Sequence, residues 1–308
     1  MGVMTVLGEI SPDDLGVTQM HEHVLANADF EKNDFNLVMD EIDVATEEIG
    51  CYKAAGGQSI VEQSCEGLGQ DVVGLKEISE RTGVNLIASA GYYRECSYPN
   101  YVYKANDVQL ARGLIKQLNE GIGETSIRPG ILAEIATEYG VGKMSSLEEK
   151  VFTAVAYAQV ETGVPVSTHC WAGELASDQI RILTSNGVPP HKILIGHLGV
   201  DNDAKDRIFR IADQGVYIGI DCIGFEYEAV VAMKDRDKAR FIRELKQRGH
   251  LERIMISQDL IRKLYLKHYH GHGYDYLLRR FVPMLYDEGL NKTEIDTLLR
   301  ANPRRIFS

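Results

Sequence analysis

The chain has 308 residues, of which 44% are hydrophobic, and its 33 Lys and Arg against 45 Asp and Glu give a net charge of −12. This length suits one α/β domain with a large core. A surface this acidic repels nucleic-acid phosphates and anionic lipid, which excludes both as expected partners. We therefore expect a small-molecule substrate, and a homodimer stays open as a further partnership.

Cysteine use and hydropathy predict a cytoplasmic location. The five cysteines are dispersed without a CxxC pair, a pattern typical of reduced thiols. The N-terminal residues lack the basic region and the long apolar run of a signal peptide. No stretch of about 18 apolar residues indicates a transmembrane helix.

Eight short apolar runs recur along the chain, each four to nine residues long. Runs of this length are typical of buried parallel strands rather than helices. They are Val17–Met20, Ser59–Cys65, Asn85–Tyr93, Gly130–Thr137, Pro165–Cys170, Ile193–Leu198, Tyr217–Cys222 and Arg253–Gln258.

The segments between these runs show helical patterns. The clearest lies between Ser145 and Gly163: Ser145 with Glu148 fits a capping box, and Gly163 is a natural C-terminal stop. The other predicted helices are Asp107–Glu120, Glu174–Asn186, Asp237–Arg248 and the tail Lys292–Ser308.

Strands that alternate with helices predict a parallel α/β sheet, which can be open or closed. An open, doubly wound sheet would need a Gly-rich phosphate loop after an early strand, and the sequence contains neither GxGxxG nor GxxxxGK[ST] in that context. The pattern therefore favours a closed (β/α)8 TIM barrel. No Pro- or Ser-rich linker divides the chain, so we expect one domain over residues 1–308, with the tail helix docked under the barrel.

Polar side chains stand at the carboxyl ends of the predicted strands. They are His21 and His23 after the first run, Glu134 in the fourth, His169 in the fifth, His197 in the sixth and Asp259 after the eighth. In a barrel these strand ends converge on one mouth, where active sites form. Four imidazoles and two carboxylates are typical ligands of zinc and similar divalent ions.

Six ligands exceed the four that one tetrahedral ion needs, so we predict two divalent ions bridged by Glu134. Zn is the expected metal, with Mn or Co as alternatives. Taken singly, each residue has another explanation. The histidines could face solvent or the core, Glu134 could be a buried ion-pair partner, and Asp259 could cap a helix. Their joint placement at the strand ends favours the metal site.

A series of ordered segments carries a family resemblance. They are 16–23 (GVTQMHEH), 55–57 (AGG), 90–93 (AGYY), 130–135 (GILAEI), 165–169 (PVSTH), 195–197 (IGH), 257–259 (SQD), 271–278 (GHGYDYLL) and 302–305 (NPRR). With these segments nearly the whole chain resembles the phosphotriesterase family of the amidohydrolase superfamily, and within it the phosphotriesterase homology protein branch. The resemblance implies that His21, His23 and Asp259 hold a more buried metal ion and that His169 and His197 hold a more exposed one.

Glu134 stands where many members of that family carry a carboxylated lysine between the metals. The glutamate side chain is shorter than that of a carboxylated lysine. The resemblance therefore gives less reason to expect phosphotriesterase activity in this protein. Two ions roughly 3.5–4 Å apart can share a hydroxide whose pKa falls toward ~7. Asp259 would then act as a ligand and as the catalytic proton shuttle.

The sequence thus predicts a metal-dependent hydrolase of a carbonyl ester, with a lactone as the first candidate. The alternatives are an N-acyl amide hydrolase, a phosphotriesterase, or a catalytically inactive barrel with a binding role. Tyr93, Arg94 and Arg262 are the predicted substrate-binding residues, because the first two follow the third strand and the last follows Asp259 by three residues. The alternative for both arginines is a surface ion pair.

Overall fold

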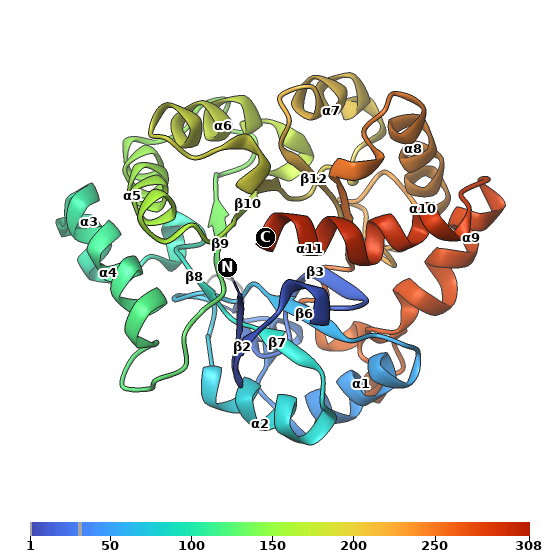
Figure 1. Ribbon diagram of the computed structural model, residues 1–308, viewed down its shortest axis with the longest axis horizontal. Helices are drawn as coiled ribbons and strands as arrows, with labels where there is room; N and C mark the ends of the chain where they lie inside the picture. Colours follow the sequence, from blue (N-terminus) through green and yellow to red (C-terminus); the bar gives the residue numbers. More distant parts are fainter. Residues whose placement is uncertain (1, 30–32) are drawn as a thin grey trace.

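The computed structural model describes residues 2–29 and 33–308. Within them, eight strand positions form the wall of a barrel, and helices surround it (Figure 1). The wall consists of β3 (Thr18–Glu22), β6 (Ser59–Glu62), β7 (Asn85–Ile87) with β8 (Ser89–Ala90), β9 (Ile131–Ala136), β10 (Val166–His169), β11 (Ile193–Ile195), β12 (Tyr217–Ile220) and β13 (Ile254–Ile256). The predicted (β/α)8 barrel is confirmed, and each predicted apolar run overlaps its strand.

Hydrogen bonds join the strands in chain order around the barrel. One parallel series links β3, β6 and β7, and a second links β8 through β13. β7 and β8 are parts of one strand position, separated only by Ala88. The first and last strands meet where Asp259 N donates to His21 O at 3.0 Å and His21 N donates to Ser257 Oγ at 2.8 Å. Two of the predicted metal ligands therefore take part in closing the barrel.

Four of the five predicted helices begin and end within two residues of the expected positions. The predicted tail helix is instead two short α-helices joined by the π-helical segment Thr297–Ala301. α4 (Asp107–Glu120) has the predicted bounds, and α5 (Ser146–Thr162) carries the capping box of Ser145 with Glu148 and ends at Gly163, with φ 73°. The others are α1 (Ile42–Ala54), α2 (Val72–Thr82), α3 (Asn100–Lys104), α6 (Ala176–Ser185), α7 (Lys205–Ala212), α8 (Asp235–Gln247), α9 (Val282–Asp287), α10 (Lys292–Asp296) and α11 (Asn302–Phe307). In the described part of the chain, no helix has the length and apolar character that crossing a bilayer requires.

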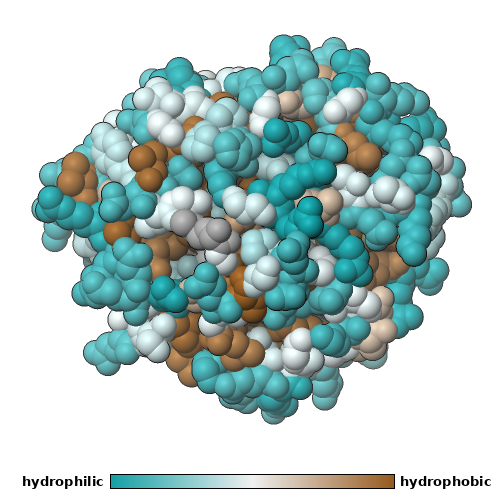
Figure 2. Space-filling view, in the orientation of Figure 1, coloured by the Kyte–Doolittle hydropathy of each residue, from teal (hydrophilic) through white to brown (hydrophobic). Residues whose placement is uncertain are grey.

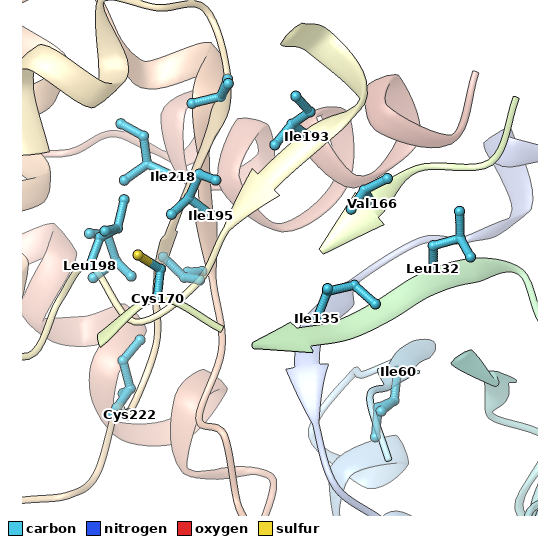
Figure 3. Close-up of a cluster of buried hydrophobic side chains, with 14 of the residues drawn as sticks. Ile60, Leu132, Ile135, Val166, Cys170, Ile193, Ile195, Leu198, Ile218 and Cys222 are labelled. Atoms are coloured by element: carbon cyan, nitrogen blue, oxygen red, sulfur yellow. The ribbon is translucent and has the colours of Figure 1, made fainter. Parts of the chain in front are cut away.

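Side chains of the barrel strands alternate between two hydrophobic clusters. Ile193 and Ile195 of β11 belong to the large outer cluster between the strands and the helices, part of which Figure 3 shows. Leu194 between them belongs to the inner cluster at the base of the barrel, as Met255 of β13 does. This period of two, with apolar residues on both faces, is expected for buried parallel strands. The core therefore fixes which side chains can face the barrel axis.

The C-terminal residues cover the base of the barrel, as predicted. Ile306 and Phe307 of α11 join the inner cluster together with Val3. Lys192 Nζ donates to the carbonyl oxygens of Ile306 at 2.9 Å and Ser308 at 2.7 Å. Figure 1 shows α11 crossing this end of the barrel, and Figure 2 shows that the same face is mostly hydrophilic outside. With the base filled, the open end is the one at the strand carboxyl termini.

Two glycines provide a test of how helix ends contribute to stability. Gly83 ends α2 in the left-handed region at φ 65°, whereas Gly50 lies inside α1, and an added Cβ would meet open space at both. We expect Gly83→Ala to lower the free energy of unfolding by about 1–2 kcal/mol, because alanine is strained in the left-handed region. Gly50→Ala should raise it by about 0.5–1 kcal/mol. Denaturant unfolding measures both, and effects of the same sign would contradict this account.

Candidate metal centre

Six side chains converge at the carboxyl ends of the strands, and we call them the ligand cluster. They are His21, His23, Glu134, His169, His197 and Asp259, the six residues predicted as metal ligands. Glu134 lies at their centre. Its Oε1 is 2.9 Å from His169 Nδ1, 3.0 Å from His197 Nε2 and 3.3 Å from His21 Nε2. One carboxylate thus contacts imidazoles from three different strands.

Asp259 is the second carboxylate that contacts the histidines of the cluster. Its Oδ1 is 3.3 Å from His23 Nε2 and 3.5 Å from His21 Nε2. Asp259 is also the more exposed of the two carboxylates, with 11% of its side chain accessible against 2% for Glu134. Both carboxylates line the cavity above the cluster, and Asp259 is the more accessible of the two to an incoming substrate.

The cluster fits two divalent cations. Ligand atoms within 4.8 Å of one another form overlapping groups. Glu134 is common to two of them, one with His21 and His23 and one with His169 and His197. Asp259 belongs to a further group with His21 and His197. Among the described residues, neither ring nitrogen of the buried His21 has a hydrogen-bond partner. Buried polar atoms without a partner are costly. Coordination of a cation through Nε2, the nitrogen nearest Glu134 and Asp259, would satisfy one of the two.

The charges of the cluster favour ionised carboxylates. Burial opposes ionisation of Glu134, but the charges of His21 and His169 and the hydrogen bonds from His169 and His197 hold its pKa well below the ordinary value. Metal binding needs ionised carboxylates and neutral imidazoles, so bound cations would take the place of the histidine charges beside Glu134.

A carboxylate that the sequence analysis did not select orients one of the histidines. Asp221 accepts hydrogen bonds from His197 N at 2.9 Å and from the His197 Nδ1 position at 3.0 Å. Burial disfavours its charge, yet His197 lowers the pKa of Asp221 to about 2. This contact turns His197 Nε2 toward Glu134, the arrangement usual behind metal-binding histidines. Asp221 follows β12, so its strand-end position was a signal that could have identified it.

Three residues of the site have left-handed backbone conformations. They are His197 at φ 58°, Cys222 at φ 51° and Asp259 at φ 55°, and they follow β11, β12 and β13. Such conformations are uncommon outside glycine and cluster at functional sites. Cys222 Sγ also donates to Asp259 Oδ2 at 3.4 Å. The bends therefore place the last three strand ends around the same point.

The motif at 271–278 supports the cluster from behind. Tyr274 OH donates to His23 O at 2.6 Å. Gln258, next to Asp259, donates through Nε2 to Gly273 O at 3.0 Å and accepts from Leu277 N at 3.1 Å. The motif thus holds the backbone of both strands that carry His23 and Asp259.

A buried carboxylate, Glu22, is the last residue of β3 and stands between His21 and His23 in the sequence. It accepts from Gln258 N at 2.6 Å and Leu260 N at 3.0 Å, on either side of Asp259. Burial raises the pKa of Glu22 to about 7, although these two hydrogen bonds act in the other direction. Glu22 was not among the predicted functional residues, and only its place inside the HEH segment could have drawn attention to it.

A cavity of about 190 Å³ opens above the ligand cluster. Its lining is mostly aromatic and aliphatic apart from the cluster itself, with two charged residues at the mouth. The lining residues outside the cluster are Tyr93, Trp171, Phe225, Glu228, Val230, Ile261 and Arg262. Two of the three predicted substrate-binding residues, Tyr93 and Arg262, therefore face the cavity.

Arg94, the third predicted substrate-binding residue, is not part of the cavity lining. Its guanidinium makes a bidentate ion pair with Glu138, with Nη2 to Oε2 at 2.6 Å and Nε to Oε1 at 3.1 Å. Burial opposes its charge, but Glu138 raises the pKa of Arg94 further above its usual range. A substrate anion would have to displace Glu138, so the ion-pair alternative describes Arg94 better.

Comparison with known proteins places this geometry in a family. Residues 1–307 match the model of the phosphotriesterase family. A phosphotriesterase homology protein from Escherichia coli (strain K12) is 32% identical over 298 residues, covering 97% of this chain and 100% of the relative. An N-acetyltaurine hydrolase from Xenopus tropicalis is 31% identical over 340 residues, covering 98% and 97%.

Solved structures agree with the sequence matches. The Escherichia coli phosphotriesterase homology protein, crystallised with phosphate in its active site, has a TM-score of 0.91 at 32% identity, covering 96% of this chain and 100% of the other. A lactonase from Listeria monocytogenes has a TM-score of 0.92 at 25% identity, covering 100% and 99%. Both structural matches cover the barrel and its mouth together. This chain belongs to the phosphotriesterase family.

Proposed function

We propose that this protein is a binuclear metal-dependent hydrolase that cleaves a carbonyl ester, with a lactone as the favoured substrate. The observation that carries the proposal is the ligand cluster at the floor of a small cavity, in which Glu134 serves two groups of imidazoles. Two divalent ions, Zn or alternatively Mn or Co, would be held there by the six residues of the cluster. A single domain, a homodimer and a cytoplasmic location stay predictions.

Each reacting residue has a distinct part in this proposal. When bound, the two metal ions would activate a water molecule and polarise the substrate carbonyl. Asp259 is the ligand at the cavity surface, so it would accept a proton and pass it to the leaving group. Glu134 would hold both ions in place. Tyr93, whose ring lies edge-on to His169 at 5.1 Å, would direct a hydrogen bond or a flat surface toward a lactone ring.

Amide hydrolysis is the second candidate. The N-acetyltaurine hydrolase from Xenopus tropicalis, which by its name cleaves an N-acyl amide, is 31% identical to this chain over almost its full length. An amide presents the same carbonyl to the same floor of the cavity. Its leaving nitrogen needs more complete protonation than an ester oxygen, which would make Asp259 more important.

Metal content tests the ligand cluster directly. We expect protein purified without chelator to carry close to two divalent ions per chain. Glu134→Ala should lower metal content and activity together, because both ions lose a shared anionic ligand, whereas Glu138→Ala, at the same strand end but outside the cavity, should retain the metal. Elemental analysis measures the content. A value near zero after metal reconstitution would rule out the binuclear centre, and dependence on bicarbonate would contradict the role of Glu134.

Removing one hydroxyl tests the support behind His23. Tyr274→Phe deletes the donor to His23 O. We expect metal affinity to fall about tenfold, as is usual when a group behind a ligand is lost. Competition with a chromophoric chelator measures this affinity in the absence of turnover. Tyr217→Phe, the same change at the barrel base, is the control, and equal losses in the two variants would refute a positioning role.

A substrate panel at equal metal loading tests the bond that is cleaved. Sugar lactones, acyl-homoserine lactones, N-acyl amino acids and an activated phosphotriester would be compared by kcat/KM. We expect a lactone to lead, Asp259→Asn to lower its rate about 100-fold or more, and Tyr93→Phe to lower it about tenfold. Tyr92→Phe, whose hydroxyl faces Tyr101 instead, should have little effect.

The ranking of the panel decides between the candidates. If an N-acyl compound leads, the amide alternative is correct. If only the phosphotriester reacts well, Glu134 in place of the carboxylated lysine does not disfavour phosphotriesterase activity.

A further inference from the structure

Three loops meet at the mouth of the cavity through a small group of charged side chains. Arg262, in the loop after β13, lies with Nη1 3.4 Å from Asp34 Oδ2 and with Nε 3.8 Å from Glu228 Oε1. Asp34 precedes the short helical turn Phe35–Leu37, and Glu228 lies in the loop after β12. Arg262 and Glu228 both line the cavity, and all three side chains are about one-third exposed. We call these three residues the mouth triad.

The mouth triad has two carboxylates for one guanidinium, so its formal charge is −1. Arg262 was predicted to bind substrate, with a surface ion pair as the alternative, and its positive charge lies within ion-pair distance of two carboxylates. A substrate anion placed on Arg262 would become a third negative group within a few ångströms of Asp34 and Glu228. Like charges at that distance repel, although partial exposure and salt weaken the effect. The mouth triad therefore disfavours the binding of a substrate anion at Arg262.

Glu228 is held in place from two directions. Tyr265 OH donates to its Oε1 at 2.5 Å, and Lys234 Nζ donates to its backbone carbonyl at 3.1 Å. The Tyr265 ring in turn stacks on Phe225, with centroids 4.5 Å apart and planes inclined by 23°. Within residues 2–29 and 33–308, the hydrogen bond to the Glu228 carboxylate goes to Oε1, and Oε2 accepts none. This positioned carboxylate of the cavity lining therefore has one oxygen that can accept a further donor.

The residues around Glu228 indicate which part of a substrate could contact it. Phe225, Val230 and Ile261 line the same cavity as Glu228 and the ligand cluster, and they give it apolar surface. An apolar spacer would lie against these side chains, and a cationic end would meet Glu228 and restore neutrality to the mouth triad.

We propose that the substrate carries a protonated amine remote from its scissile carbonyl, and that Glu228 selects it. Arg262 orders the two carboxylates through its ion pairs and is a positioning residue rather than an anion-binding one. This inference rests on the proposed function, since it assigns the distal end of the substrate cleaved at that site. It makes the loop after β12 the part of the molecule that determines specificity.

Matched probes separate the amine from an anion of the same length. N-acetyl-1,4-diaminobutane and N-acetyl-4-aminobutyrate would be titrated calorimetrically into the metal-loaded protein, and their hydrolysis would be followed in parallel. We expect the amine probe to bind at least about tenfold more tightly, as a charge-assisted contact of about 1.4 kcal/mol implies. Where the amine probe is hydrolysed, its advantage should appear mainly in KM.

Variants assign the preference to one residue. Glu228→Gln should bring the two affinities close together, because the amide keeps the shape and loses the charge. Glu226→Gln, two positions earlier and outside the cavity lining, should leave the preference intact. A carboxylate could also bind the metal ions directly, but that contribution is the same in wild type and in Glu228→Gln, so the change between them reports the mouth triad alone.

The outcomes distinguish this inference from the proposed function. Tighter binding of the carboxylate probe that is lost in Arg262→Met would overturn it and make Arg262 an anion site. Equal binding of both probes, or binding of neither, would overturn it as well. A preference for the amine without hydrolysis of any amide or lactone by the metal-loaded protein would leave Glu228 as the selecting residue and refute the hydrolase instead.

Discussion

One buried carboxylate joins the first and the last strand of the barrel. Glu22, at the end of β3, receives the backbone N–H groups of Gln258 and Leu260, which follow β13, so the contact spans 236 and 238 residues of sequence. Asp259 lies between those two donors and opposite His21 and His23. A carboxylate without such partners would be too costly to bury. Barrel closure and the position of Asp259 in the ligand cluster therefore depend on the same interaction.

The buried carboxylates in and beside the ligand cluster also need compensating partners. Glu134, Asp221 and Asp259 are all buried, and each contacts at least one imidazole. Buried charges are tolerated when opposite charges or cations compensate them. The left-handed conformations at His197, Cys222 and Asp259 are a further cost that the surrounding packing has to offset. Buried charges and strained backbone conformations both lower stability. Their concentration at the carboxyl ends of the strands is therefore characteristic of a functional site.

Much of this arrangement could be predicted from the sequence because its determinants are local. Apolar runs of strand length identified the strands, and strand ends identified the ligand cluster, since the carboxyl ends of barrel strands share one mouth. Asp221 carried the same signal, but nothing in its own position separates an orienting carboxylate from a surface one.

The remaining features depend on contacts across the chain. Arg94 is neutralised by Glu138 of a neighbouring strand end, and Arg262 by Asp34 and Glu228 from two irregular loops. Loops without periodicity give no indication of which charges will meet. The ligand cluster is fixed by buried backbone hydrogen bonds, whereas the mouth triad is held by half-exposed ion pairs of small energy. The loops at the mouth can therefore vary in charge without disturbing the ligand cluster. Relatives named for a lactonase and for an N-acetyltaurine hydrolase accordingly show that this family's fold does not determine the substrate.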